Sequence, residues 1–267
     1  EERIAKNKNS QLSTNLFSTG IATYINSSNA DVVNLHWVLG NMLSIREIGQ
    51  LTKPVVWTIH DMWPFCGAEH YSPDVIKARF EAGSNKENRD PNESGWDVSE
   101  YVWKRKIKCW KRPMTIVSPS HWLAECAARS ELFRNYRIEV IPNPLDTTKW
   151  RPTEQLTARK LLDLPKEDKI ILFGAIGGTT DSRKGADIIV DAMKHFKAYG
   201  IQNIQILIFG QSEPKESTDY GFPVHFIGHL YDELSLSLVY SAADVMLVPS
   251  RQEAFGQTAS EAHACGV

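Results

Sequence analysis

Short apolar runs alternate with helical stretches along this chain, and the alternation limits the possible folds more than any other feature of the sequence. Short, strongly apolar runs are typical of strands buried on both faces of a parallel sheet. Strands that alternate with helices indicate α/β units, so an α/β fold is predicted. The predicted strands are 32–37, 54–59, 114–117, 138–141, 170–175, 204–209, 224–227 and 245–248, and the predicted helices are 120–129, 186–196 and 232–242.

The predicted strands fall into two sets, divided by a proline-rich segment. Pro142, Pro144 and Pro152 lie within eleven residues, where neither a strand nor a helix can continue. A chain of 267 residues, 42% of them hydrophobic, is long enough for two domains with their own cores. The predicted organisation is a first domain over 1–143, a hinge over 144–152 and a second domain over 153–267.

Composition excludes several classes of protein. A net charge of −2 provides no field that would recruit nucleic acid. No apolar run approaches the roughly 18 residues that cross a bilayer, and residues 1–6 lack the apolar stretch of a signal peptide. The cysteines stand at 66, 109, 126 and 265 and form no C-x-x-C pair. Few, scattered cysteines are typical of a reducing compartment, so a cytoplasmic location is expected.

The segment after the last predicted strand carries the richest set of candidate residues. Glu253 follows the strand 245–248, and a helix is predicted from about Gly256. Ligands of open α/β sheets bind at the carboxyl ends of strands, and free amides at a helix start bind anions. With Glu253 in the loop rather than on the helix, both it and Glu261 can reach one ligand. An ordinary acidic residue at a helix start explains Glu253 alone equally well.

A glycine-rich turn follows the strand 170–175. Gly177 and Gly178 would let a ligand approach the backbone, and the adjacent cations Arg183 and Lys184 could pair with a diphosphate. The turn matches neither G-x-G-x-x-G nor the P-loop pattern, because glycine rather than serine or threonine follows Lys184. Taken alone, this turn is a weak signal for a ligand site.

His60 directly follows the predicted strand residues Val56 to Ile59. A histidine at a strand end faces the same edge of the sheet as the other carboxyl-end loops, where ligands bind. A satisfied structural histidine is the alternative interpretation.

In chain order, these residues resemble glycosyltransferase family four, a group of retaining GT-B glycosyltransferases also described as glycosyl transferases group 1. The resemblance is strongest over 250–266 and covers nearly the whole chain apart from 74–100. It rests on His60, Ser118-Pro119-Ser120, 141–146, Gly185 after Arg183 and Lys184, and Glu253 with Glu261. It implies two Rossmann-like domains that face a cleft, the first on the acceptor side. The family's opening strands and closing elements are missing, so both domains are expected to be incomplete and the chain truncated at both ends.

The resemblance also implies roles for the candidate residues. Lys184, with Arg183, binds the donor diphosphate, and Glu261 binds the ribose hydroxyls. Glu253 contacts the donor sugar and helps to stabilise the transition state, while His60 faces that sugar from the other domain. The amides of Ala254, Phe255, Gly256 and Gln257 contact sugar or phosphate.

The implied reaction is transfer of a sugar from a nucleoside-diphosphate sugar to a hydroxyl of a glycan or lipid-linked acceptor, with retention, in bacterial polysaccharide or glycoconjugate biosynthesis. The nucleotide sugar is a co-substrate, and neither a cofactor nor a metal is expected. Two alternatives stay open. One is a non-catalytic nucleotide-sugar-binding fragment, which the truncation favours. The other is a nicotinamide-dependent oxidoreductase, against which the absence of its glycine fingerprint counts.

A basic segment precedes the third predicted strand, with six cations between Lys104 and Arg112. Trp103, Ile107 and Trp110 repeat at helical spacing. We predict a helix that packs these three residues on the sheet and leaves its cations in water. Peripheral contact with an anionic membrane is the alternative.

The segment 74–100 is predicted to be an insertion. Its part 81–94 is polar and nearly free of large apolar residues. Such a composition indicates an exposed loop, with disorder as an alternative.

Overall fold

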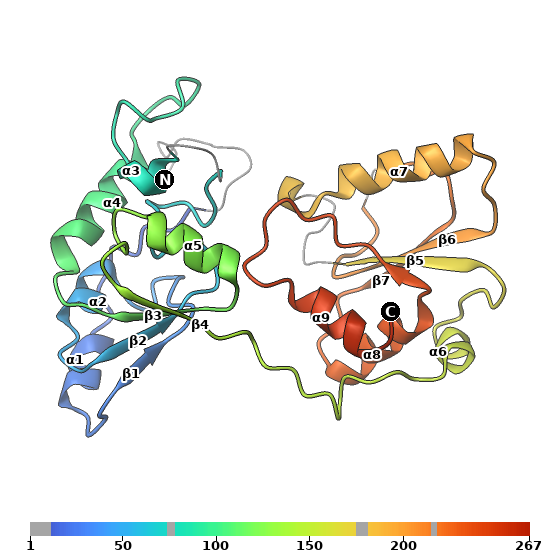
Figure 1. Ribbon diagram of the computed structural model, residues 1–267, viewed down its shortest axis with the longest axis horizontal. Helices are drawn as coiled ribbons and strands as arrows, with labels where there is room; N and C mark the ends of the chain where they lie inside the picture. The colour runs from blue at the N-terminus through green and yellow to red at the C-terminus, as the bar shows by residue number, and fades with distance from the viewer. Residues whose placement is uncertain (1–11, 74–77, 175–180, 215–217) are drawn as a thin grey trace. The chain divides into compact units, whose positions relative to one another are not determined.

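A computed structural model describes residues 12–73, 78–174, 181–214 and 218–267. The chain divides into two compact units, Glu1–Pro142 and Asn143–Val267. Each unit contains a parallel sheet with helices in its connections (Figure 1). The predicted α/β class, with two parallel-sheet domains, is therefore confirmed.

The sheet of the first unit has the order β1-β2-β3-β4, and every neighbouring pair is parallel. Figure 1 shows these strands side by side, coloured from blue to green. The strands are β1 (Val33–Leu35), β2 (Val55–Thr58), β3 (Thr115–Ser118) and β4 (Arg137–Val140). The helices are α1 (Ile21–Ser27), α2 (Ile45–Gln50), α3 (Arg79–Ala82), α4 (Val98–Cys109) and α5 (His121–Arg129).

Aromatic rings make up much of the first core. Trp57 on β2 meets Trp110 edge to face, with ring centroids 5.4 Å apart, and Phe133 packs on both. These rings are at most 5% exposed. Edge-to-face aromatic pairs add stabilisation beyond that of the buried area alone. Trp57 therefore holds β2 against the core close to the carboxyl end of the strand.

The sheet of the second unit has the order β7-β6-β5-β8 and is also parallel. Its strands are β5 (Lys169–Gly174), β6 (Ile204–Phe209), β7 (Val224–Gly228) and β8 (Val245–Met246). Its helical segments are α6 (Gln155–Leu161), the 3-10 turn η1 (Ser182–Lys184), α7 (Ala186–Ala198), α8 (Glu233–Ala242) and α9 (Gln257–Ala264).

Side chains cap the starts of α5 and α8. Ser120 accepts a hydrogen bond from the Leu123 amide at 3.2 Å, and Asp232 accepts one from the Ser235 amide at 2.8 Å. Each satisfies an amide that has no partner within its own helix. Of the predicted strands, β1 differs most, because it covers Val33–Leu35 rather than 32–37, and β8 ends at Met246 rather than at 248.

The prediction for the basic helix is right about Trp110, which is buried just after the end of α4, but wrong about the rest of the buried face. The residues of α4 that are buried are Val98, Val102 and Lys106, a stripe at spacings of four, while Trp103 and Ile107 are only partly buried. The Lys106 ammonium donates to the carbonyls of Trp63, Cys66 and Gly67. Three carbonyl acceptors match its three N–H donors, which explains how a lysine occupies a core position.

Two glycines bring α4 close to the rest of the unit. A Cβ on Gly67 would lie 2.5 Å from the Ser99 carbonyl oxygen, and one on Gly49 would lie 2.3 Å from that of Cys109. The helix therefore meets its neighbours through backbone at both ends. Among the described residues, no helix combines the length and apolar character needed to cross a membrane.

Candidate nucleotide-sugar site

The turn before α7 and the loop after β8 lie in direct backbone contact. Gly185 has a φ of +71°, and a Cβ on it would lie 2.3 Å from the Pro249 carbonyl oxygen. The Arg251 amide donates to the Arg183 carbonyl at 2.7 Å. Glycine is needed at position 185 both for the left-handed backbone and for the close approach. This contact sets the distance between the two loops that carry the candidate residues.

Lys184 and Glu253 form an ion pair across this contact. The Lys184 Nζ lies 2.6 Å from Glu253 Oε1, and the two side chains are 21% and 28% exposed. Ser250 Oγ donates to the same carboxylate oxygen at 2.9 Å. The structure thus joins two residues that sequence reasoning selected separately. It also adds Ser250 to the candidate site.

The other cations of the turn before α7 and of the loop after β8 also form ion pairs. Arg183 pairs with Asp181 at 2.6 Å, and the Asp181 side chain also accepts from the Arg183 amide. Arg251 makes a two-pronged ion pair with Asp187 on α7. The Arg251 pair ties the loop after β8 to α7, and Arg251 also donates to the Ser182 carbonyl of η1 at 2.7 Å. The predicted ligand residues Gly177 and Gly178 lie outside the described residues.

The start of α9 offers unpaired amides. Gly256 caps the helix with a φ of +81°, and nothing lies within 4 Å of its missing Cβ. The amides of Phe255 and Gly256 have no acceptor within the described part of the chain. With Gln257 at the first helical position, they form an anion-binding helix start of the predicted kind. Ala254 is buried, so only its backbone is available there.

Glu261 lies in a separate pocket of about 220 Å³. It is 9% exposed, and its Oε2 accepts a hydrogen bond from the Tyr240 hydroxyl at 2.7 Å. Burial raises the pKa of Glu261, and hydrogen bonds from Tyr240 and Gln257 oppose the rise. Gly210, His229 and Tyr231 contribute to the lining, together with Phe209, Leu230, Leu236 and Thr258. The two glutamates therefore have different surroundings, one in an ion pair and one in a hollow.

His60 belongs to the first unit, at the end of β2, where it pairs with His36 at the end of β1. His36 Nδ1 lies 3.0 Å from His60 Nε2, and the rings stack at 5.3 Å. The Asn34 amide nitrogen lies 3.3 Å from His36 Nε2. With the Asn34 side-chain NH₂ assigned as the group facing His36, a neutral His36 carries its proton on Nδ1 and donates it to His60. The His60 proton then resides on Nδ1. Sequence reasoning missed His36.

The loop after His60 is held by charged and polar contacts. Asp61, 7% exposed, pairs with His70 at 2.8 Å and accepts from the Trp63 amide at 3.0 Å. Ser13 Oγ lies 2.8 Å from the other His70 ring nitrogen. Burial lowers the pKa of His60, and the neighbouring His36 lowers it further, while Asp61 opposes both. The chain therefore favours a neutral imidazole at this strand end.

The close contact at Gly185 predicts a specific cost of substitution. Gly185→Ala should lower the free energy of unfolding by about 2 kcal/mol or more, because a left-handed backbone and a backbone overlap are both imposed. Gly200→Ala at the other end of α7 is the matched control, since Gly200 has a φ of +73° and nothing within 4 Å. Urea denaturation of both variants measures the difference. Equal losses would show that the Pro249 contact contributes nothing.

The histidine pair predicts a change in titration. His36→Ala should raise the pKa of His60, since the substitution removes a neighbour that disfavours the imidazolium and admits water. Histidine side-chain NMR titration measures this value, and it also reports the tautomer. His121→Ala, at an exposed position of the same unit, should leave the His60 pKa unchanged. A neutral His60 protonated on Nε2 in the unsubstituted protein would contradict the assignment.

Comparison with known proteins gives a consistent picture. The family model described as Glycosyltransferase Family 4 matches residues 5–149, and the model described as Glycosyl transferases group 1 matches residues 154–267. The D-inositol 3-phosphate glycosyltransferase of Xylanimonas cellulosilytica is 30% identical over 146 residues, which are 49% of this chain and 33% of that protein. The enzyme of the same name from Acidothermus cellulolyticus is 32% identical over 145 residues, 49% of this chain and 32% of that protein. The matched region thus spans about a third of these relatives.

Solved structures share the fold. Sucrose-phosphate synthase from Thermosynechococcus elongatus aligns with a TM-score of 0.64 at 23% identity, over 92% of this chain and 57% of that one. Anabaena HepE in complex with UDP and glucose aligns with a TM-score of 0.58 at 14% identity, over 92% and 59%. At these identities the likeness concerns the fold alone. The family models cover both units, and the chain belongs to glycosyltransferase family 4.

Proposed function

We propose that the protein transfers a sugar from a nucleoside-diphosphate sugar to an acceptor hydroxyl, with retention of the anomeric configuration. The observation that carries the proposal is the ion pair between Lys184 and Glu253, held where the turn before α7 meets the loop after β8. A cation, a carboxylate and the free amides at the α9 start lie on these loops. Such a set suits a ligand with a sugar at one end and a diphosphate beside it.

The nucleoside end of the donor is proposed to occupy the pocket at Glu261. Its volume of about 220 Å³ suits a small ring system. The Glu261 carboxylate accepts from Tyr240 and Gln257, and its remaining lone pairs can accept hydroxyl protons. Two hydroxyls of a ribose are the ligand proposed for Glu261. UDP is the first nucleotide to test, because Anabaena HepE was solved with UDP and glucose.

The proposed chemistry involves one bond broken and one formed at the anomeric carbon. The bond to the diphosphate oxygen breaks, the acceptor oxygen bonds to the same face, and the acceptor proton passes to the leaving phosphate. Lys184 and the amides of Phe255 and Gly256 stabilise the charge that gathers on the diphosphate. Glu253 accepts hydrogen bonds from the sugar. The role of His60 toward the sugar, and that of Arg183 toward the diphosphate, stay predictions.

The acceptor is proposed to be a glycan or a lipid-linked glycan in bacterial polysaccharide or glycoconjugate biosynthesis. A non-catalytic nucleotide-sugar-binding protein remains the second candidate, since the site's contacts suit binding as well as turnover. A nicotinamide-dependent oxidoreductase is the third, and it would bind NAD in place of UDP. Calorimetry with UDP and NAD, together with a sugar-transfer assay on the full-length protein, distinguishes the three.

Separate roles are predicted for Lys184 and Glu253. Lys184→Ala should weaken UDP binding by at least about 1 kcal/mol, the scale of one charge-assisted hydrogen bond. Glu253→Gln should reduce turnover more than donor affinity, because its proposed partner is the reacting sugar. Calorimetry and steady-state kinetics measure the two effects. Lys194→Ala, on the exposed face of α7, is the control and should change neither. Unaltered UDP affinity in Lys184→Ala would remove Lys184 from the site.

A pH dependence is predicted from Glu261. Its raised pKa means that the carboxylate takes up a proton at a higher pH than an ordinary glutamate does as the solution is acidified. The protonated form loses an acceptor for ribose, so UDP affinity should fall on acidification from pH 7, by up to about tenfold. UDP titrates in this range too, but Glu261→Gln experiences the same ligand titration. The difference between the two profiles isolates Glu261, and parallel profiles would contradict its role.

A peripheral contact with anionic lipid is the proposal for the basic end of α4, in a protein located in the cytoplasm. Lys108 and Lys111 are exposed, whereas Lys106 is buried and Lys104 pairs with Glu100. The attraction is therefore smaller than six cations would give, at about 1 kcal/mol per cation. Changing Lys108 and Lys111 together to Gln should abolish low-salt cosedimentation with phosphatidylserine vesicles, while Lys194→Gln should not. Cosedimentation that survives the double change excludes this surface.

A further inference from the structure

The insertion and the start of α4 enclose a hollow that the proposed transfer reaction does not use. Its volume is about 600 Å³. Two aromatic residues and several charged residues line it, among them Lys86, Arg89, Trp96, Glu100, Tyr101 and Lys104. None of these residues belongs to the ion pair at Lys184, the Glu261 pocket or the histidine pair. The hollow is therefore distinct from the site proposed for the donor.

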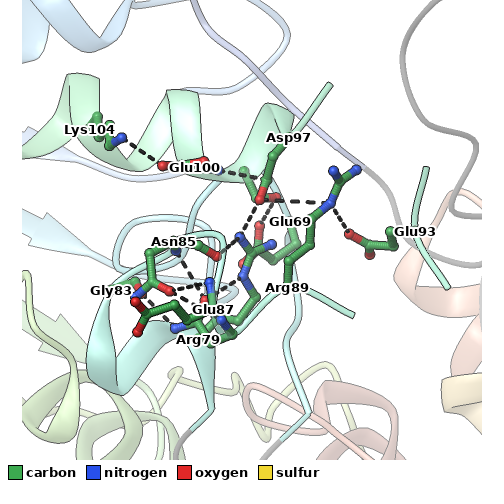
Figure 2. Close-up of polar contacts among 12 residues, drawn as sticks. Glu69, Arg79, Gly83, Asn85, Glu87, Arg89, Glu93, Asp97, Glu100 and Lys104 are labelled. Carbon is green, nitrogen blue, oxygen red and sulfur yellow. Dashed lines mark hydrogen bonds and ion pairs between the residues drawn. The ribbon is translucent and has the colours of Figure 1, made fainter. Parts of the chain in front are cut away.

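The insertion is an ordered loop, and the alternative of disorder is wrong for residues 78–100. Arg79 forms an ion pair with Asp97 at 2.6 Å, in which the side chains are 16% and 8% exposed (Figure 2). Arg79 also donates to Asn88 at 3.1 Å, and Asp97 accepts from the Glu100 amide at the start of α4. These largely buried contacts connect the two ends of the insertion, near Arg79 and Asp97, to the start of α4.

Arg89 holds the tip of the insertion together by contacts with residues 93–95. Its guanidinium donates to the carbonyls of Gly95 and Ser94 at 2.9 and 3.1 Å. It also contacts Glu93 at 3.5 Å (Figure 2). Behind the loop, Gly83 has a φ of +76°, and a Cβ there would lie 2.3 Å from the Trp103 ring. The hollow is thus preformed by contacts on two sides, as expected of a binding site.

The apolar part of the hollow is an aromatic platform. Trp96 is 54% exposed, and its ring lies 4.9 Å from that of Tyr101, tilted by 53°. An exposed tryptophan supported by a second ring offers a flat apolar face with polar groups at its edge. A pyranose has the matching shape, with C–H bonds on one face and hydroxyls around its rim. The platform therefore suits a sugar ring.

The charged residues around the platform are mostly paired with one another. Lys104 pairs with Glu100 at 2.6 Å, which leaves further N–H donors on Lys104 and the second oxygen of Glu100 for hydroxyls. Lys86 has no partner within the described part of the chain. The lining holds three cations and two carboxylates, 3 − 2 = +1, and Lys86 accounts for the excess. A ligand with one negative group beside its hydroxyls fits this distribution.

We propose that this hollow binds a saccharide that carries a carboxylate, with a sugar ring on Trp96 and the carboxylate near Lys86. A nucleotide fits less well, because a diphosphate would meet two carboxylates and one unpaired cation. A membrane surface fits less well too, because the platform lies in a concave site whose other cations are paired. The exposed cation Lys108 lies about two turns further along α4, about 12 Å beyond Glu100, and Lys111 follows the end of the helix.

The experiment is saturation-transfer NMR and calorimetry on the full-length protein without a donor. The probes are a hexasaccharide of alternating glucuronate and N-acetylglucosamine, tetragalacturonate, and maltohexaose as the neutral comparison. At least one acidic probe should bind, more tightly than maltohexaose. Trp96→Ala should weaken that binding tenfold or more, and Lys86→Gln should remove the preference for the acidic probe. Tyr24→Ala, an exposed aromatic in the same unit, should do neither.

Several outcomes would overturn the proposal. These are no binding by either acidic probe, equal affinity in Trp96→Ala at unchanged circular dichroism, or a loss of UDP binding or vesicle cosedimentation in Trp96→Ala. Failure of sugar transfer would leave the result intact, because the measurement needs no donor and no turnover. Conversely, a protein that transfers sugar but binds neither acidic probe would retain the proposed function and lose this site.

Discussion

Parallel pairing of β5 with β8 is the constraint on which the candidate site depends. Ile171 pairs with Val245 and Leu172 with Met246, so the two strands end at the same edge of the sheet. The segments that follow them must then meet, and Lys184 reaches a carboxylate 69 residues further along the chain. In an antiparallel pair these segments would leave opposite edges. The ion pair is therefore a consequence of strand direction. Glycine at position 185 then allows the two loops to come into backbone contact.

Much of the fold could be predicted from the sequence, because strands buried on both faces must be apolar and helices need caps. Candidate residues such as Glu253 and Lys184 could be selected too, since they follow predicted strands. Their partners could not. Tyr240 on α8 reaches Glu261, and His36 reaches His60, only because particular elements are neighbours in space. Periodicity says which face of an element is buried but not which element covers it.

One prediction about the first unit and one alternative failed for the same reason. A lysine on a basic helix was expected in water, yet Lys106 meets three carbonyls of a loop some 40 residues upstream. Disorder was the alternative interpretation of the polar loop, yet Arg79 and Arg89 satisfy its carbonyls and carboxylates internally. In both cases the polar groups are removed from water and form hydrogen bonds and ion pairs with one another. Composition alone predicts that such groups are solvated, because it carries no information about which of them are close enough to pair.

The glycine contacts of α4 bear on how this unit tolerates change. Gly67 and Gly49 meet the backbone at the two ends of the helix, and Gly83 meets the Trp103 ring. None of these three glycines lines the hollow, so these close contacts do not depend on the lining residues. The tip of the insertion can therefore diverge while α4 keeps its place against the loop after β2. Asp97 is the exception, because it lines the hollow and also caps α4, so selectivity for a ligand can change at tip residues such as Lys86 while Asp97 is retained.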